Sequence, residues 1–391
     1  MKRLLFSLYG FAFFNKFLLL TPVYAIFMQE NGLNDLQLST MFIISAIGTI
    51  VAQAPITFLT YRFGQRWSMI LGQFLKAFAI LLWLVMPNYI GFVIGMFMWG
   101  AQAGFRSVAF EGLVYDSVHK YGSAKDYSKI LGRKSTYESI GTALSAFGSL
   151  LMFKGYDWVT WASVTAILLS VLCLLMVPYR AKLNKKSSNT KLSIRETLRT
   201  GFKVCKKTPC LISIMLLTLF VVNVPFLDDF LSPIALQIGI QTEYVGFLSF
   251  ILLGCATVGQ RFAYKFKRIP DLFLCALIAV VGIGYLIFSV FYSISWLWAL
   301  GVAYMLFYGI YTLLYAQFQH MIPSRHRSVV LSLYTTLTYI VYMAVCGIIG
   351  LGGSIGSWRY SIMIQGLLMI AVFIFALVRL YKKCPLVDDT I

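Results

Sequence analysis

Charged residues are scarce in this sequence. Only 12% of its 391 residues are Asp, Glu, Lys or Arg, against about a quarter in an ordinary soluble domain. Apolar residues make up 59% and aromatic residues 16%, and apolar runs recur along the whole chain. No stretch is left that is long enough to fold as a separate water-soluble domain. The composition therefore excludes a mainly soluble architecture and indicates a protein built from membrane spans.

Motifs of ATP-driven pumps, redox proteins and metal sites are also missing. The chain has no Gly-x-x-x-x-Gly-Lys loop that would cradle phosphates. Its seven cysteines form no Cys-x-x-Cys pair, and His119, His320 and His326 lie apart. Such spacing gives no reason to expect a redox motif or a metal cluster. We predict a protein that is not an enzyme and uses no cofactor and no metal.

Twelve apolar runs have about the 20-residue length that a helix needs to cross a bilayer. They cover residues 4–28, 37–60, 67–87, 89–115, 129–153, 158–178, 209–232, 243–264, 270–291, 294–319, 328–350 and 357–380. The first run follows a basic N-terminus, as in a signal peptide. Asn15 and Lys16 interrupt it and no small-x-small cleavage site follows, so we retain it as a span.

Lys and Arg residues concentrate in alternate connections between these runs, and the loops on the opposite side contain only Lys154 and Arg359. Short loops rich in Lys and Arg stay in the cytoplasm. We therefore predict a multi-pass protein of the plasma membrane, in a bacterium the inner membrane, with both termini cytoplasmic. The net charge of +19 then reflects this topology and an anionic inner leaflet. A nucleic-acid partner is not expected, because the basic residues form no single patch.

A polar, basic segment divides the chain between the sixth and seventh runs. Ser193 and Glu196 in this segment form a Ser-x-x-Glu capping pattern, which predicts a short amphipathic helix from Ser193 onward. The predicted organisation is an N-terminal six-helix bundle, a basic cytoplasmic linker, a C-terminal six-helix bundle and a cytoplasmic tail, at residues 1–178, 179–208, 209–381 and 382–391.

Three stretches carry a resemblance to a known family. PITFLTYRFGQRWSM, residues 55–69, is similar to the G-x-L-A-D-R-x-G-R-[KR] loop of the major facilitator superfamily, with Arg62, Gly64 and Arg66 in place. FEGLVYDSV, followed by YSKILGRKS and IPSRHRSVVLSL, resembles bacterial small-molecule and drug exporters of that superfamily. The resemblance covers essentially the full length. It implies an all-α membrane protein of twelve transmembrane helices, arranged as two pseudo-symmetric six-helix bundles around a central cavity.

Two departures from the family pattern concern coupling. Tyr61 stands where the loop motif has its acidic residue, so it cannot supply the charged contact that this residue is thought to make in the family. The fifth span also lacks the Gly-Pro pair that resembles an antiporter signature, although Gly141 and Gly148 permit close helix packing.

Charged residues at matching depths predict a buried ionic layer. At 1.5 Å of rise per residue, Arg106, Glu138 and Lys76 each lie about ten residues from the cytoplasmic ends of their spans. A charge inside a membrane bundle is normally paired or turned toward water. We predict Arg106 with Glu138 as the principal pair and Glu138 as the better candidate for a proton carrier. Alternatively, these are packing and gate salt bridges that neither titrate nor touch substrate.

A second ionic level is expected nearer the cytoplasmic surface. Glu111 and Asp116 lie toward the inner end of the fourth span. We predict that one of them pairs with Arg133 or Lys134 at the start of the fifth span. Glu111 and Asp116 are expected to be structural or gating residues.

The resemblance implies that spans one, four, seven and ten line the central path. Lys16 lies near the middle of the first span, where it either faces the path or is buried against a carbonyl or an acidic neighbour. Asp228 and Asp229 follow Pro225 in the seventh span. They form either a vestibule for cations or protons or a carboxylate-capped helix end. Asn15 and Gln102 add polar groups to the predicted cavity.

Four tyrosines mark the tenth span. Tyr304, Tyr308, Tyr311 and Tyr315 recur at helical spacing, which places four phenols on one face. Lipid offers a phenolic hydroxyl no partner, so we predict that this face lines the cavity; the alternative is packing. Such a wall suits amphipathic or aromatic molecules and can stack on cations.

We therefore predict a secondary transporter that exports a small amphipathic or aromatic organic compound, coupled to protons, by alternating access. The expected partners are this substrate, protons and the bilayer, and the protein is expected to be a monomer. Uptake, or flipping of a lipid-linked compound, stays open because it would use the same helix count. A non-transporting receptor or scaffold would favour long soluble loops or an extra domain, and neither is visible.

Overall fold

The computed structural model describes residues 2–121, 126–177, 194–207, 209–263, 265, 270–323 and 326–381. For some helical residues in these ranges it describes the backbone and not the side chain. The described part consists of α-helices and short 3-10 helices, and no strand occurs within it. The chain divides into two compact units, Met1–Ser187 with Gln241–Phe250, and Ser188–Ile240 with Ile251–Ile391.

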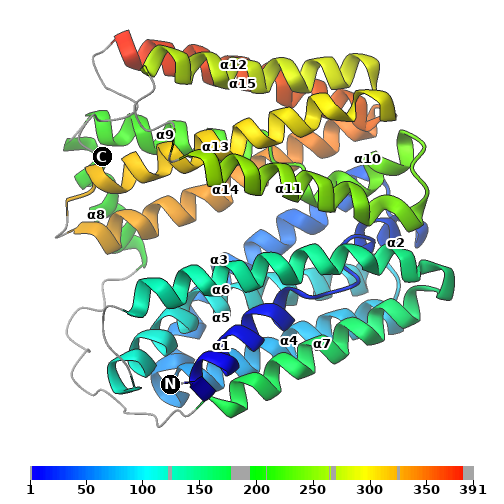
Figure 1. The fold of residues 1–391 in the computed structure, drawn as a ribbon, viewed down its shortest axis with the longest axis vertical. Coiled ribbons are helices and arrows are strands. Elements are labelled where there is room, and N and C mark those ends of the chain that lie inside the picture. Colours follow the sequence, from blue (N-terminus) through cyan, green and yellow to red (C-terminus); the bar gives the residue numbers. More distant parts are fainter. Residues whose placement is uncertain are drawn as a thin grey trace. The chain divides into compact units, whose positions relative to one another are not determined.

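The first unit is a bundle of long helices in which α1 packs against α6 and α7, and α5 against α3 and α4 (Figure 1). Its elements are α1 (Lys2–Lys16), α2 (Tyr24–Glu30), α3 (Asp35–Phe63), α4 (Gln65–Val85), α5 (Tyr89–Tyr121), α6 (Asp126–Ser145), the 3-10 helix η1 (Ala146–Lys154) and α7 (Tyr156–Met176). The 3-10 helix η3 (Thr242–Tyr244) and the start of α11 (Val245–Ala263) belong to the same unit.

The second unit is also a helical bundle, in which α12 and α15 lie side by side (Figure 1). Besides the rest of α11, its elements are α8 (Ile194–Lys207), α9 (Pro209–Asn223), the 3-10 helix η2 (Asp228–Phe230), α10 (Leu231–Gln237), α12 (Asp271–Phe291), the 3-10 helix η5 (Ile294–Trp296), α13 (Leu297–Met321), α14 (Arg327–Ser354) and α15 (Trp358–Tyr381).

Nine helical segments in the described part of the chain are long and apolar enough to cross a membrane. Every predicted apolar run contains a helix or a pair of helices, with ends displaced by a few residues. Two runs differ from the prediction because they are interrupted, at residues 17–23 and at residues 224–227. Proline lies in each interruption, Pro22 in the first and Pro225 in the second. Proline lacks the N–H that a helix needs and restricts the residue before it, so both breaks have a local cause.

The predicted helix in the linker is present as α8, while its capping residue Ser193 lies outside the described residues. One side of α8 packs against α9 and α14. Gly201 and the buried Cys205 lie on this side, and a Cβ on Gly201 would be 3.1 Å from Leu333. Arg199 and Lys203 are exposed, so α8 combines a packed face with a basic one.

Four of the seven cysteines, Cys173, Cys205, Cys275 and Cys346, are buried free thiols. They pack as small apolar side chains. Cys210 at the start of α9 differs from them, because it is disulfide-bonded.

Candidate functional site

The first span unwinds between α1 and α2, and neighbouring helices satisfy the exposed backbone. The amide N–H of Leu20 donates to the hydroxyl of Ser163 on α7, across 2.9 Å. Glycines on the fifth span allow the unwound chain to approach closely. A Cβ on Gly148 would lie 1.9 Å from the carbonyl oxygen of Leu19, so only glycine fits there. Non-helical backbone at membrane depth is tolerated when protein partners surround it in this way.

A buried lysine completes the end of α1. Lys76 on α4 is 4% exposed, and its Nζ donates to the backbone carbonyl of Asn15 across 2.8 Å and lies 3.3 Å from Asn15 Oδ1. Carbonyls in the last turn of a helix lack an intrahelical donor, and the partial negative charge there favours a cation. Gln73 Nε2 donates to the same Asn15 Oδ1 across 3.2 Å. The broken span is therefore tied to α4 through charge and hydrogen bonds.

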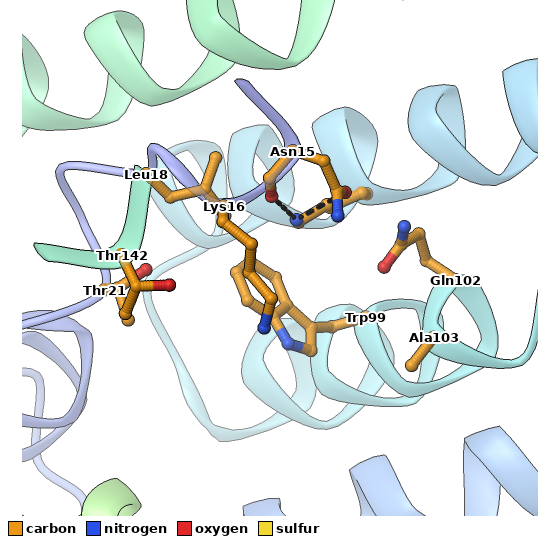
Figure 2. Close-up of a pocket in the computed structure, with 9 residues that line it drawn as sticks. Asn15, Lys16, Leu18, Thr21, Trp99, Gln102, Ala103 and Thr142 are labelled. Atoms are coloured by element: carbon orange, nitrogen blue, oxygen red, sulfur yellow. Dashed lines mark hydrogen bonds between the residues drawn. The ribbon is translucent and has the colours of Figure 1, made fainter. Parts of the chain in front are cut away.

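These groups form one wall of a pocket of about 160 Å³ in the first unit. Figure 2 shows Thr21 and Thr142 on one side of the pocket and Gln102 and Ala103 on the other. The residues that line it are Asn15, Lys16, Leu18, Thr21, Lys76, Trp99, Gln102, Ala103 and Thr142. Two of these nine residues are lysines and none is Asp or Glu.

Two side chains on α5 shape the pocket further. The ring of Trp99 lies under the ammonium of Lys76, with 5.0 Å between Nζ and the ring centroid, a distance typical of a cation–π contact. Gln102 is 5% exposed, and its Nε2 is buried without a hydrogen-bond partner among the described residues. A buried amide donor without an acceptor is uncommon.

The structure brings together three residues that were predicted to line the cavity, Asn15, Lys16 and Gln102. Lys76, which the depth argument placed with Arg106 and Glu138, lines the same pocket. Sequence reasoning missed the other lining residues. Trp99 lies three positions before Gln102, which places both on one helix face, and this spacing was the available signal.

The seventh span breaks in a similar manner between α9 and η2. The hydroxyl of Tyr285 donates to the carbonyl of Pro225. Gln365 Nε2 on α15 donates to the carbonyl of Val224 across 2.8 Å and lies 3.2 Å from that of Phe226. Polar side chains from two other helices thus satisfy the unwound carbonyls, as at the first break.

Two carboxylates lie just after this break, and phenols hold them. Tyr304 donates to Asp228 Oδ1 across 3.0 Å, and Tyr308 donates to Asp228 Oδ2 across 3.1 Å. Tyr342 on α14 donates to Asp229 Oδ2 across 2.6 Å. Hydrogen bonds to ionised groups are stronger than neutral ones, so the three phenols anchor the carboxylates at the break.

The predicted tyrosine face divides into two parts. Tyr304 and Tyr308 reach Asp228, as described above. Tyr311 and Tyr315 stack on each other with ring centroids 5.5 Å apart, and Tyr315 packs against the apolar cluster that contains Phe318. Tyr304 and Tyr308 therefore belong to an acidic site, whereas Tyr311 and Tyr315 make packing contacts. Contact of these tyrosines with substrate remains a prediction.

The structure describes only some of the side chains that were predicted to form a charge layer in the fourth and fifth spans. Glu138 Oε2 lies 2.8 Å from Lys134 Nζ, one turn earlier on α6. This ion pair was not predicted. Arg106, Glu111 and Asp116 have helical backbone in α5, but their side chains lie outside the described part. Pairing of Arg106 with Glu138 therefore stays a prediction, as does the pairing of Glu111 or Asp116 with Arg133 or Lys134.

The loop motif joins α3 to α4 through a single residue. Gly64 has φ of +83°, a conformation that favours glycine. Arg66 Nη1 donates to the carbonyl of Val177, just beyond α7, across 3.2 Å. Arg62 is exposed and lies over the ring of Phe63. The motif glycine thus makes the tight turn, and Arg66 ties it to the end of the sixth span.

No group of three or more His, Cys, Asp or Glu residues in the described part of the chain is arranged to hold a metal ion. The chemistry available at the two breaks is binding and proton exchange. One break has cationic hydrogen-bond donors, and the other has carboxylates held by phenols.

Comparison with known proteins shows which family this chain matches. The family model of the Major Facilitator Superfamily matches residues 5–345. None of the curated proteins compared with the chain matches it.

Solved structures of transporters share the fold across nearly the full length of both chains. The nucleoside transporter NupG is 11% identical with a TM-score of 0.74, and 97% of this chain and 98% of that chain are covered. A D-xylose-proton symporter is 14% identical with a TM-score of 0.68 and 96% of each chain covered. A bacterial homolog of the human lysosomal transporter Spinster, inward-facing and unoccupied, is 15% identical with a TM-score of 0.69 and 98% of each chain covered.

Proposed function

We propose, from the premise that this chain belongs to the Major Facilitator Superfamily, that it exports a small amphipathic or aromatic organic compound in exchange for protons. Members of the superfamily are transporters rather than enzymes, with twelve membrane helices in two halves. The protein is accordingly a multi-pass membrane transporter. The substrate class, the coupling ion and the direction are the proposed part.

One observation carries the proposal. The first span of the first unit and the first span of the second unit are both broken, and each break holds charged side chains. In secondary transporters, discontinuous helices of this kind form the sites for substrate and coupling ions. Lys76 lies at one break and Asp228 at the other. A helix broken only for packing would not need ionic groups at the interruption.

Asp228 is the better candidate for the proton carrier, because its contacts suit a change of protonation better than those of Glu138. A tyrosine hydroxyl can donate or accept a hydrogen bond, so Tyr304 and Tyr308 can serve Asp228 in both its charged and its neutral form. Protonation of Glu138 would instead remove the acceptor charge from its ion pair with Lys134. The variants Asp228→Asn and Glu138→Gln separate the two carboxylates.

The substrate class follows from the aromatic lining. Trp99 lines the pocket at the first break, and Tyr308 lies beside the carboxylates at the second. Aromatic walls with a few placed polar groups suit ligands that have both an apolar body and a polar end. Amphipathic or aromatic organic compounds fit this description.

The direction of export rests on the sequence resemblance to bacterial exporters. Uptake is the second candidate, because a structural neighbour is a D-xylose-proton symporter. We also propose that both termini are cytoplasmic and that the exposed basic side of α8, with Arg199, Lys203 and Lys206, faces the anionic inner leaflet of a bacterial plasma membrane.

Counterflow in proteoliposomes tests the proposal. Purified protein is reconstituted, and vesicles loaded with one unlabelled compound are given the same compound in labelled form, with and without a pH gradient. A panel of aromatic cations, anions and neutral compounds is used as the probe. Counterflow, together with net outward transport that a pH gradient drives, supports the proposal. Absence of counterflow for every compound, in protein that binds members of the panel, would reject it in favour of a receptor.

A further inference from the structure

An apolar groove lies on the surface of the first unit, where α4 and α7 pack against each other (Figure 1). Its volume is about 630 Å³, and its lining residues are apolar. They come mainly from residues 74–81 of α4 and 161–168 of α7. Ala77 is only 6% exposed, whereas its neighbour Phe78 is 57% exposed and Trp161 is 56% exposed. A small buried side chain beside large exposed ones makes this surface a recess rather than a flat helix face.

The groove begins close to one end of both helices. Leu81 lies four residues before the end of α4, and Trp161 lies five residues after the start of α7. From there the groove follows each helix as far as Phe74 and Leu168, a rise of about 10 Å. One leaflet contributes half of the hydrocarbon thickness of roughly 30 Å. The groove therefore fits within one leaflet and covers much of the length of an acyl chain.

A cation and aromatic rings lie at the end of the groove that is nearer the start of α7. Lys154, the last residue of η1, is exposed, and its Nζ lies 5.2 Å from the ring centroid of Trp158 and 5.7 Å from that of Phe153. Trp158 lies three residues before Trp161, so both lie on one face of α7. Lys and Trp at the ends of spans lie at the level of the lipid headgroups. The order along this surface is therefore ammonium, indole and apolar groove.

This order matches that of a phospholipid, in which the phosphate is followed by the glycerol esters and the acyl chains. An ammonium has three donors for phosphate oxygens. Lipid tails are as apolar as leucine, so a recess of this kind on the outside of a membrane bundle suits an acyl chain. Asp157 is exposed three residues from Lys154 and offsets the net charge of this surface. The expected contact is therefore with the phosphate, rather than a general attraction to anionic lipids.

We propose that a phospholipid binds at this surface, with its phosphate at Lys154, its glycerol region beside Trp158 and one acyl chain in the groove between α4 and α7. The assignment to the outer leaflet rests on the topology given under the proposed function. Binding of the lipid requires neither a transported substrate nor a coupling ion, so it goes beyond that function and can be measured by itself.

Photolabelling of the purified full-length protein in nanodiscs tests the inference. The probe is a phosphatidylcholine with a diazirine in the middle of one acyl chain, and the labelled residues are mapped by mass spectrometry of peptides. We expect residues 74–81 and 161–168 to be labelled about fivefold more than the exposed face of α12, which includes Phe273 and Ile283. Equal labelling of α12 would show ordinary surrounding lipid and overturn the inference.

A second probe tests the role of the phosphate. It is a diacylglycerol with the same acyl chains and the diazirine at the same carbon. We expect it to label the groove about fivefold less than the phosphatidylcholine, because a basic residue near a lipid surface contributes about that factor. Equal labelling by the two probes would overturn the contact between the phosphate and Lys154.

Variants locate the binding. Lys154→Gln is expected to lower groove labelling by the phosphatidylcholine about fivefold and to leave labelling by the diacylglycerol unchanged. Arg359→Gln is its matched control, because Arg359 is also exposed but lies on α15 in the second unit. Trp161→Ala should lower labelling by both probes, and Trp298→Ala, at a position that is 59% exposed, is its control. Phe78→Ala replaces Trp161→Ala if that variant does not fold. Unchanged labelling in both Lys154→Gln and the groove variant would refute the site.

Two further outcomes separate this inference from other occupants and from the transport proposal. A dimer in native mass spectrometry, together with loss of the groove label, would replace the lipid by a second copy of the chain. Groove labelling that depends on Lys154, in protein that transports no compound, rejects the transport proposal and leaves the lipid site. Transport by protein that is labelled uniformly rejects the lipid site alone.

Discussion

The ammonium of Lys76 donates a hydrogen bond to the backbone carbonyl of Asn15 across 2.8 Å, one residue before α1 ends. A side chain of the third span thus completes the hydrogen bonding of the first span at its break. The same ammonium lies over Trp99, so one lysine links three helices and forms part of the pocket. Its removal should affect both folding and ligand binding.

Lys76→Met is expected to lower the free energy of unfolding by about 1–3 kcal/mol, because it leaves a buried carbonyl without a donor. Equilibrium unfolding in detergent, followed by tryptophan fluorescence, measures the change. Lys203→Met on the exposed side of α8 is the control, with an expected change within about 0.5 kcal/mol. Similar values for the two variants would show that the Asn15 contact contributes nothing.

Asp228→Asn is expected to abolish transport driven by a pH gradient while counterflow persists, because asparagine cannot carry a proton. Glu138→Gln is expected to retain gradient-driven transport, since Glu138 is ion-paired with Lys134. Asp157→Asn, at an exposed position on α7, is the control for a lost carboxylate. Coupling that survives Asp228→Asn and is lost in Glu138→Gln would make Glu138 the carrier, as the sequence predicted.

Tyr304→Phe is expected to destabilise the second unit by about 1–3 kcal/mol. Its hydroxyl donates to Asp228 and accepts from the N–H of Leu227 across 3.2 Å, so the variant leaves a buried amide without an acceptor. Tyr311→Phe retains the stacked ring and should change stability much less. Thermal unfolding of both variants in the same detergent gives the comparison. A larger loss of stability in Tyr311→Phe than in Tyr304→Phe would contradict the assignment of Tyr311 and Tyr315 to packing.

Gly148→Ala is expected to destabilise the first unit by about 1–3 kcal/mol, or to prevent folding, because an added Cβ would lie 1.9 Å from the carbonyl oxygen of Leu19. Gly132→Ala on α6 is the control, since a Cβ there meets nothing within 4 Å in the described structure. Alanine should be neutral or slightly stabilising in that helix. The yield of monodisperse protein and the Tm distinguish the two variants.

The positions of the helices followed from the sequence because apolar runs of about 20 residues have one main physical explanation. The two breaks did not follow, since one proline in a long apolar run often produces only a kink. Pro22 and Pro225 were visible, but the partners that stabilise the unwound chain, Ser163 and Gln365, lie more than a hundred residues away. Their approach depends on tertiary packing.

The candidate sites were predictable in part for a similar reason. The resemblance assigned Lys16, Asn15 and Gln102 to the spans that line the predicted cavity, and these three residues share a pocket. The sequence shows which residues share a face of one helix. It does not show which neighbouring helix that face contacts, because this depends on how the helix is rotated about its axis. The depth argument therefore grouped Lys76 with Glu138, and it did not show the contact of Lys76 with Asn15 or that of Tyr304 with Asp228.

The hydroxyl of Tyr304 contacts both Asp228 and the backbone amide of Leu227. One phenol from the tenth span thus contacts both the carboxylate and the peptide unit that joins α9 to η2. A change in the hydrogen bonding of Asp228 would therefore be felt first by the backbone at the bend of the seventh span.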